Sequence, residues 1–177
     1  TYLIEEIKVP TDYELNTSVI KFVGHVNGST LTIEKLEGET REDIIVSKQE
    51  NVDYKTILKV EDEAKARLKI TKKEQDTENV IRGVKFKITG NGLPETGKIL
   101  TTNINGEISL KGLTINQQYT LQEVSANGYY LATAINFRIV NNDGNYEIQI
   151  LSGTVRESSI TEEDSIPIIN MTIDNEK

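Results

Sequence analysis

The feature that most constrains the fold is a series of short runs in which apolar and polar residues alternate, separated by two-residue turn sequences. Alternation with a period of two is typical of a β-strand with one buried face. Asn-Gly and Asp-Gly pairs are typical of tight turns. The runs include residues 31–33, 84–88 and 146–150, and the turn pairs are Asn27-Gly28, Asn91-Gly92, Asn105-Gly106, Asn127-Gly128 and Asp143-Gly144. We therefore predict an all-β chain, with the helix-prone residues 60–67, too few to form a stable helix alone, as a connector.

The composition excludes several classes of function. The 177 residues contain 20 Lys and Arg against 28 Asp and Glu, and the net charge of -8 repels nucleic-acid phosphates and anionic lipids. We therefore expect no nucleic-acid partner. The chain has no cysteine and a single histidine, so it lacks the ligands of a cysteine-based or multi-histidine zinc site. We expect no metal and no other cofactor.

The single histidine, His25, lies in the sequence Gly24-His25-Val26-Asn27-Gly28, which has the composition of a turn. We interpret it as an exposed loop residue rather than a catalytic base. No uninterrupted apolar run approaches the length of a membrane-spanning helix, and the first residues do not resemble a signal peptide. We expect no membrane contact within this fragment.

An internal repeat relates the start of the chain to its last third. In each copy a Glu follows a Tyr after four positions, and these two residues, Glu6 and Glu123, are 117 positions apart (123 minus 6). The copies also correspond at their ends, where Asp62 matches Asn175 at a separation of 113 positions (175 minus 62). The repeat therefore indicates tandem domains of about that length.

The two copies are not equally long. The second copy has 51 positions between Lys72 and Glu123 (123 minus 72), which the first copy would need before residue 1. We therefore predict that residues 1–64 are the carboxyl-terminal half of one β-domain and that residues 65–177 are a complete domain. A half domain exposes unpaired strand edges, so we expect upstream chain or a neighbour to complete it.

Three strands of the second domain each carry one polar residue in register with their buried face. The predicted buried sets are Leu68, Ile70 and Lys72; Tyr119, Leu121 and Glu123; and Met171, Ile173 and Asn175. A buried amine, carboxyl and carboxamide are each expensive unless they satisfy one another. The alternation thus predicts that these three polar side chains converge, whereas the competing interpretation places each at a strand end where it reaches water.

A converging triad of this kind has a definite chemistry. Burial in an apolar interior favours the neutral amine of a lysine and the protonated acid of a glutamate. The amine of Lys72 is then a nucleophile, and Glu123 can polarise the carboxamide of Asn175 and pass a proton to departing ammonia. The expected product is a Lys-Asn isopeptide bond that forms once and is not turned over.

Several sequences of the second domain form a recognisable set. They are Leu68-Lys69-Ile70-Thr71-Lys72-Lys73, Gly83-Val84-Lys85-Phe86-Lys87-Ile88, Thr101-Thr102-Asn103-Ile104-Asn105-Gly106, Gly112-Leu113, Tyr119-Thr120-Leu121-Gln122-Glu123 and Gly128-Tyr129. Together they resemble the collagen-adhesin B-type domains, or SpaA-type pilin domains, of Gram-positive surface proteins. The resemblance covers residues 65–177 and, through its second half, residues 1–64.

The resemblance implies an immunoglobulin-like or prealbumin-like β-sandwich in tandem repeats, located extracellularly at the cell surface or cell wall. It also implies an isopeptide bond between Lys72 and Asn175 with Glu123 as the catalyst. Three neighbours remain alternatives for the reactive pair, namely Lys73, Asn170 and Asp174. In the first copy the matching positions are Glu6 and Asp62, and the lysine would lie upstream.

The sequence Leu93-Pro94-Glu95-Thr96-Gly97 matches the Leu-Pro-x-Thr-Gly pattern that sortases recognise. A sorting signal is followed by an apolar span and a basic tail, whereas here the next residues lead into a predicted strand. Because Asn91-Gly92 and Pro94 are typical of loops, we interpret the match as a turn sequence.

Two classes of function fit these observations. The first is a structural stalk module of a cell-wall-anchored surface protein or pilin, whose partners are the neighbouring repeats of the same protein. The alternative is an adhesin module that binds a host extracellular protein, for example along an exposed strand edge. An enzyme for external substrates is not expected, because the sequence offers no plausible histidine-based triad and no glycine-rich phosphate loop.

Overall fold

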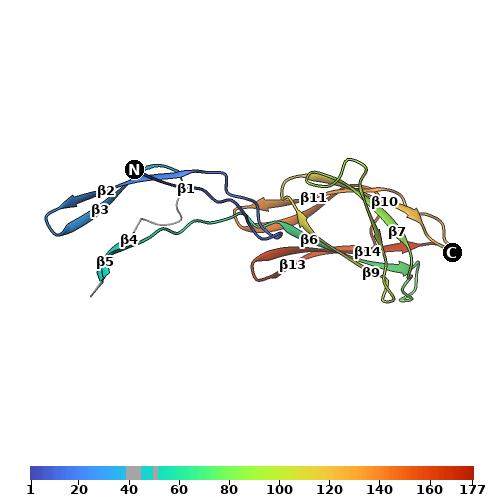
Figure 1. The fold of residues 1–177 in the computed structure, drawn as a ribbon. Helices are drawn as coiled ribbons and strands as arrows, with labels where there is room; N and C mark the ends of the chain where they lie inside the picture. The colour runs from blue at the N-terminus through green and yellow to red at the C-terminus, as the bar shows by residue number, and fades with distance from the viewer. Residues whose placement is uncertain (39–44, 50–51) are drawn as a thin grey trace. The chain divides into compact units, whose positions relative to one another are not determined.

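The computed structural model describes residues 1–38, 45–49 and 52–177. The described residues form strands, turns and connecting segments, and no helix (Figure 1). The chain divides into two compact units, Thr1–Glu63 and Ala64–Lys177, called here the first and the second unit. No helix that is long and apolar enough to cross a membrane occurs in the described part of the chain.

The second unit is a sandwich of two β-sheets. One sheet has five strands in the order β12-β11-β10-β7-β8, and the other has four strands in the order β13-β14-β6-β9. The strands are β6 Ala66–Glu74, β7 Lys85–Gly90, β8 Lys98–Thr101, β9 Glu107–Leu113, β10 Gln118–Ser125, β11 Ile135–Asn142, β12 Asn145–Ser152, β13 Glu157–Glu163 and β14 Ile166–Asn175. The expected all-β sandwich is confirmed.

The first unit contains a three-stranded sheet in the order β1-β2-β3 and a separate hairpin, β4-β5. Its strands are β1 Tyr2–Ile4, β2 Ile20–Asn27, β3 Thr30–Glu37, β4 Ile45–Gln49 and β5 Val52–Ile57.

The core of the second unit follows directly from the alternation in the sequence. All nine residues of the three predicted buried sets are buried, with exposed fractions of 3% or less. Burying apolar surface in this way contributes roughly 25 cal/mol per Å² to folding. The hairpin between β11 and β12 turns at Asp143 and Gly144, whose φ angles of 53° and 88° are those of the predicted tight turn.

The first and last strands of the second unit, β6 and β14, lie side by side and run parallel. Their register pairs Lys72 with Ile173, Lys73 with Asp174, and Glu74 with Asn175. All other strand pairs between named strands of this unit are antiparallel. This parallel pair brings the beginning and the end of the domain sequence together.

One local prediction is wrong, and another is right only in part. His25 lies within β2, opposite Thr32 of β3, rather than in a loop. It is exposed, as expected, and its Nε2 lies 2.9 Å from Glu34 Oε2. The connector predicted over residues 60–67 is shorter than expected because β6 begins at Ala66, where pairing with β9 and β14 fixes an extended backbone.

Candidate functional site

Three strands bring Lys72, Glu123 and Asn175 together inside the sandwich. Lys72 comes from β6, Asn175 from the neighbouring β14, and Glu123 from β10 of the opposite sheet. Their exposed fractions are 0%, 3% and 2%. In each strand the polar residue follows a buried apolar residue by two positions, so both side chains point to the same face. The alternation that forms the core therefore also places the three polar side chains inside it.

Glu123 lies at the centre of the site. Its Oε1 accepts a hydrogen bond of 2.9 Å from Asn175 Nδ2 and lies 3.9 Å from Lys72 Nζ. Its Oε2 accepts a 2.5 Å hydrogen bond from the backbone N–H of Ala132. Lys72 Nζ also donates to the backbone carbonyl of Ile173 at 3.0 Å. These contacts fix the carboxyl between the amine and the carboxamide.

The environment of Lys72 favours a reactive amine. Burial lowers the pKa of Lys72 to about 8, although the charges of Glu123 and Asp174 act in the opposite direction. At neutral pH a fraction of the order of one tenth of such side chains is therefore uncharged. A neutral amine carries the free electron pair that a nucleophile needs.

The carboxamide of Asn175 is oriented differently from the expectation. Its nitrogen faces Glu123, whereas the proposed polarisation requires its oxygen there. Its Oδ1 is buried and accepts no hydrogen bond from the described residues. A half-turn of the planar carboxamide about its Cβ–Cγ bond exchanges the two atoms, and would place Oδ1 where a protonated Glu123 can donate to it.

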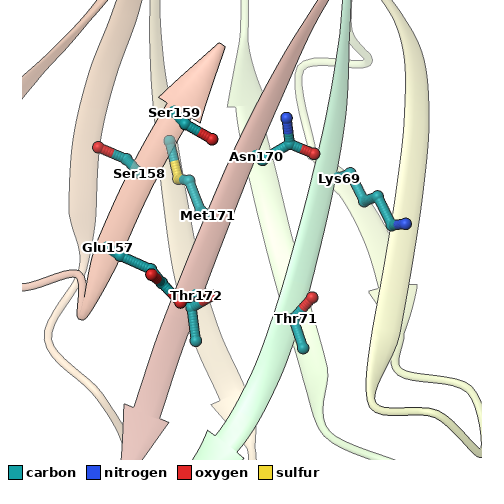
Figure 2. Close-up of a pocket in the computed structure, with 8 residues that line it drawn as sticks. All are labelled: Lys69, Thr71, Glu157, Ser158, Ser159, Asn170, Met171 and Thr172. Atoms are coloured by element: carbon teal, nitrogen blue, oxygen red, sulfur yellow. Dashed lines mark hydrogen bonds between the residues drawn. The ribbon is translucent and has the colours of Figure 1, made fainter. Parts of the chain in front are cut away.

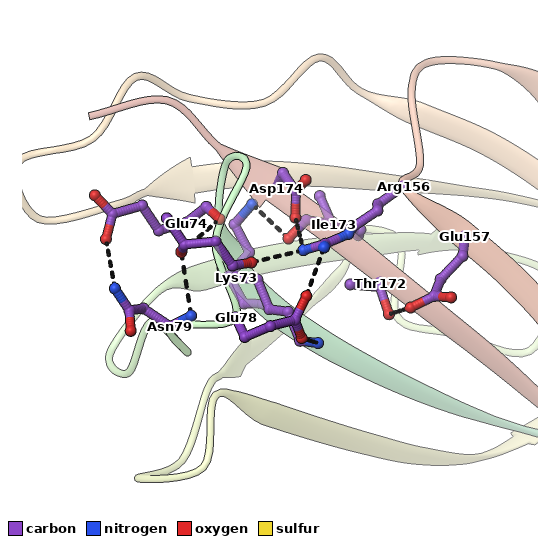
Figure 3. Close-up of polar contacts among 11 residues, drawn as sticks. Lys73, Glu74, Glu78, Asn79, Arg156, Glu157, Thr172, Ile173 and Asp174 are labelled. Carbon is purple, nitrogen blue, oxygen red and sulfur yellow. Dashed lines mark hydrogen bonds and ion pairs between the residues drawn. The ribbon is translucent and has the colours of Figure 1, made fainter.

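The alternative reactive residues Lys73 and Asp174 belong to a separate polar network, shown in Figure 3. Lys73 forms an ion pair with Glu78, and Arg156 Nη2 lies 2.6 Å from the same carboxylate. Arg156 Nη1 lies 3.6 Å from Asp174 Oδ1. The hydrogen bond from Lys73 and the charge of Arg156 lower the pKa of Glu78. Both alternatives are therefore held in ion pairs outside the buried triad.

The third alternative, Asn170, is not near Lys72. Its Nδ2 donates to Thr161 Oγ1 at 3.0 Å and to the carbonyl of Ile168 at 3.2 Å. Asn170 and Lys69 line a hollow of about 340 Å³, whose lining is mainly polar and comes from β6, β13 and β14. Figure 2 shows the side chains of its lining residues. Asn170 points away from the core because it alternates with the buried residues of β14.

The two matching residues of the first unit, Glu6 and Asp62, also lie together. Both are half-buried and line one pocket. Glu6 Oε2 accepts a 2.8 Å hydrogen bond from the backbone N–H of Asn16. Partial burial, the charge of Glu6 and a hydrogen bond to Glu6 raise the pKa of Asp62.

Comparison with known proteins assigns the fold. A family model described as the SpaA prealbumin-like fold domain matches residues 66–154, half of the chain. The chain belongs to this family. The SpaA prealbumin-like family is structural and non-enzymatic, in agreement with the prediction that the chain is no enzyme for external substrates. The matched residues include Lys72 and Glu123 but end before Asn175.

Solved structures share this SpaA-type fold at low sequence identity. The carboxyl-terminal fragment of the pilus adhesin SpaC from Lactobacillus rhamnosus GG is 15% identical, with a TM-score of 0.51, and the alignment covers 98% of this chain and 75% of that fragment. The open conformation of the same adhesin is 16% identical, with a TM-score of 0.52 and coverages of 98% and 24%. The chain therefore spans about a quarter of that adhesin. No curated protein matches the sequence.

Sequence reasoning missed two parts of this SpaA-type domain. The first is the Ala132 N–H that holds Glu123, because a backbone donor in a loop leaves no sequence pattern. The second is the Arg156 network, whose members come from separate loops and strands. The sequence shows charged residues next to Lys72 and Asn175, namely Lys73 and Asp174. It does not show that Arg156 connects them, because that connection depends on long-range contacts.

The sortase-like sequence of the domain forms the turn between β7 and β8. Gly97 N–H donates to the carbonyl of Pro94 at 2.7 Å, and Gly97 has a φ of 80°. Leu93 packs against the core, and a side chain at Gly97 would lie 2.7 Å from Lys87 Cε. These contacts are those of a closed turn, in agreement with the interpretation from the sequence.

Proposed function

We propose that the chain is a structural stalk module of a pilus-type surface protein and that its second unit joins Lys72 to Asn175 by an isopeptide bond. The observation that carries this proposal is the contact of Glu123 with both partners inside a closed core. Membership of the SpaA prealbumin-like family and a fold shared with a pilus adhesin support it.

The reaction needs only groups of the site. The uncharged Nζ of Lys72 attacks Cγ of Asn175, while protonated Glu123 hydrogen-bonds Oδ1 and polarises the carbonyl. The Nζ–Cγ bond forms as the Cγ–Nδ2 bond breaks, and Glu123 relays the proton lost by the amine to the leaving nitrogen. The products are a secondary amide and ammonia, and Glu123 ends as it began.

The bond would change how the domain responds to force and to unfolding. It would close a loop of roughly 100 residues, for which the chain-entropy model gives about 4.7 kcal/mol of stabilisation. It would also join β6 directly to β14, so that tension entering at the first strand leaves through the last. The strands between them then carry no load, a property that a stalk requires.

The proposed location is the cell surface or cell wall, and the proposed partners are neighbouring repeats of the same protein and other pilus subunits. The adhesin alternative, binding of a host extracellular protein, remains a prediction of the sequence. The chain covers 24% of the full adhesin whose fold it shares. The choice between these two roles therefore also depends on parts of the parent protein that lie outside this chain.

The test is intact mass spectrometry of the purified chain. Loss of ammonia makes the folded protein about 17 Da lighter than its sequence mass, and a peptide map should join the fragments that contain Lys72 and Asn175. The Lys72→Met variant should have the full mass calculated from its own sequence. The matched control Lys69→Met, on the exposed face of the same strand, should still be about 17 Da lighter than its calculated mass. A folded wild-type chain at its full sequence mass would contradict the proposal.

A further inference from the structure

The loop that follows β10 contacts the buried site of the second unit through its backbone. Residues 130–134 of this loop belong to no strand or turn. The N–H of Tyr130 donates to the carbonyl of Glu176 at 2.9 Å, and the N–H of Ala132 donates to Oε2 of Glu123 at 2.5 Å. Glu176 directly follows the carboxamide residue of the site. One short segment therefore holds the end of β14 with one N–H group and the central carboxyl with another.

The first unit contains the same pair of backbone contacts, made by different residues. Glu14 N–H donates to the carbonyl of Glu63 at 2.7 Å, and Asn16 N–H donates to Oε2 of Glu6 at 2.8 Å. The two donors are again two positions apart, and the acceptors are again a backbone carbonyl and a glutamate carboxyl. Because the side chains of the donor residues differ between the units, the feature that recurs is the backbone N–H.

The side chains of the segment in the second unit do not explain its contact with the site. Those of Tyr130 and Leu131 are exposed, with exposed fractions of 72% and 55%. Ala132 is half-buried and carries only a methyl group, which can form no hydrogen bond. The contact with Glu123 is therefore a property of one N–H group, and a change confined to that group can test what it does.

The two carboxyl oxygens of Glu123 have different surroundings. Oε2 accepts the hydrogen bond from Ala132 N–H, whereas Oε1 lies 2.9 Å from Asn175 Nδ2 and 3.9 Å from Lys72 Nζ. A protonated carboxyl has one hydroxyl oxygen and one carbonyl oxygen, and the carbonyl oxygen is the better acceptor of a hydrogen bond. An N–H group fixed at Oε2 therefore favours carbonyl character at that oxygen and leaves the proton on Oε1.

The location of this proton decides whether the carboxyl can act on the carboxamide. A proton on Oε1 lies at the oxygen that faces Asn175, and it can be donated to Oδ1 after the half-turn of the carboxamide. A proton on Oε2 would lie beside the N–H of Ala132, where two donors meet and neither has an acceptor. Only the first arrangement prepares the reaction.

We propose that Ala132 is a positioning residue for bond formation, whose backbone N–H keeps the proton of Glu123 on Oε1, the oxygen that faces both reaction partners. This proposal rests on the reaction proposed for the second unit. The Nζ–Cγ bond forms as the Cγ–Nδ2 bond breaks. Oε1 gives its proton to the leaving nitrogen and receives the proton that Lys72 loses, while Oε2 accepts from the N–H throughout.

The test removes this N–H and keeps every side chain. Incorporation of lactic acid, the hydroxy analogue of alanine, in place of Ala132 exchanges the backbone N–H for an ester oxygen. The full chain is refolded, and the loss of about 17 Da is followed over time by intact mass spectrometry. The ester chain should form the bond about tenfold more slowly than the wild type, the size expected for the loss of one hydrogen bond. Ala132→Pro, which also lacks the N–H, should be slowed as well.

Two matched controls separate the N–H from other properties of the loop. Ala132→Gly changes the side chain and retains the N–H, so it should form the bond at the wild-type rate. The second control is an ester at Gly97, made with glycolic acid. It removes the 2.7 Å hydrogen bond from Gly97 N–H to the carbonyl of Pro94, in a turn between β7 and β8, and should also leave the rate unchanged.

A spectroscopic measurement tests the contact without bond formation. In the Lys72→Met background, the infrared difference against the double variant with Glu123→Gln isolates the carbonyl stretch of protonated Glu123 at acidic pH. A hydrogen bond to a carbonyl oxygen lowers the frequency of this stretch. Replacing Ala132 N–H by the ester should therefore move the band to higher frequency. Because no bond forms in this background, the result is separate from the mass test of the proposed function.

Three outcomes would overturn the proposal. Bond formation at the wild-type rate in the ester chain would show that the N–H does not position the proton. Equal slowing by Ala132→Gly would assign the effect to the side chain or to the packing of the loop. An unshifted carbonyl band would show that Oε2 does not accept from this N–H in the protonated state. A wild-type chain at its full sequence mass would instead refute the reaction itself.

Discussion

Glu123 and Asn175 meet across the sandwich: Asn175 Nδ2 donates a 2.9 Å hydrogen bond to Glu123 Oε1, although β10 and β14 belong to different sheets. The same oxygen lies 3.9 Å from Lys72 Nζ. Both nitrogens thus lie near the same buried carboxyl group. A substitution of Glu123 can therefore test the proposed reaction while the surrounding strands stay in place.

Glu123→Ala should fold but remain at its full sequence mass, because the reaction loses the group that polarises the carboxamide and relays the proton. Intact mass measures the bond, and the cooperativity of thermal unfolding measures the fold. Glu147→Ala, on the exposed side of β12, is the matched control and should keep the loss of about 17 Da. Normal bond formation in Glu123→Ala would remove Glu123 from the mechanism.

The rate of bond formation should depend on the charge of Lys72. The proposed reactive state carries its proton on Glu123 and none on Lys72, so it has the same number of protons as the ion pair of these two residues. Since burial lowers the pKa of Lys72 to about 8, the rate should be nearly constant between pH 6 and about 8 and should fall about tenfold per pH unit above that value, where the pair loses this proton. Chain recovered unreacted from inclusion bodies can be refolded between pH 6 and 9 and sampled by mass spectrometry. A rate that rises with pH across this range would show that the uncharged amine alone limits the reaction and that no proton on Glu123 is needed.

Asn175→Ala should reveal the same shift as a change in stability. This variant cannot form the bond, so Lys72 remains a buried amine whose pKa in the folded state is lower than the 10.5 of the unfolded chain. Between about pH 8 and 10.5 the unfolded state binds more protons, so the free energy of unfolding should rise with pH across this window. Denaturant titrations should show this rise, and the double variant with Lys72→Met should lack it.

Arg156→Gln should move the midpoint of the pH dependence of bond formation upward. Arg156 offsets the charge of Asp174, which favours the protonated form of Lys72. Without Arg156 the carboxylate of Asp174 acts more strongly on the amine. Arg138→Gln, which loses only an exposed hydrogen bond to Gln149, is the control and should leave the midpoint unchanged. An unshifted midpoint in Arg156→Gln would show that this network does not influence the amine.

The turn at Pro94–Gly97 should protect the sortase-like sequence from processing. An enzyme that reads five successive side chains needs them in an open segment, whereas Gly97 N–H is bonded back to Pro94 and Leu93 packs on the core. Incubation of the folded chain with a sortase that recognises Leu-Pro-x-Thr-Gly should therefore give no product. A peptide of residues 90–99 should react under the same conditions, and efficient cleavage of the folded chain would contradict this prediction.

The sequence predicted the faces of the strands better than their neighbours. A period of two assigns every second residue to one face, so Lys72, Glu123 and Asn175 could be placed in the core before any contact was known. The parallel pairing of β6 with β14 has no such local signal, because it joins segments about 100 residues apart. Family resemblance, rather than alternation, indicated that these strands are neighbours.

Local composition was misleading where tertiary pairing overrides it. Gly24 and Asn27 give the surroundings of His25 the composition of a turn, yet pairing with β3 keeps the backbone extended through Asn27. The loop contact between Ala132 and Glu123 was not predictable, because any residue other than proline supplies the same N–H.

The parallel arrangement of β6 and β14 also determines the distance between the two ends of the second unit. The chain enters the second unit beside Ile168 and leaves at Asn175, and these positions are at opposite ends of the paired segment. Eight paired residues at about 3.3 Å each separate entry from exit by roughly 25 Å. An antiparallel pair would return the chain to its point of entry. The parallel pair instead separates the two ends of the second unit by the length of the paired segment.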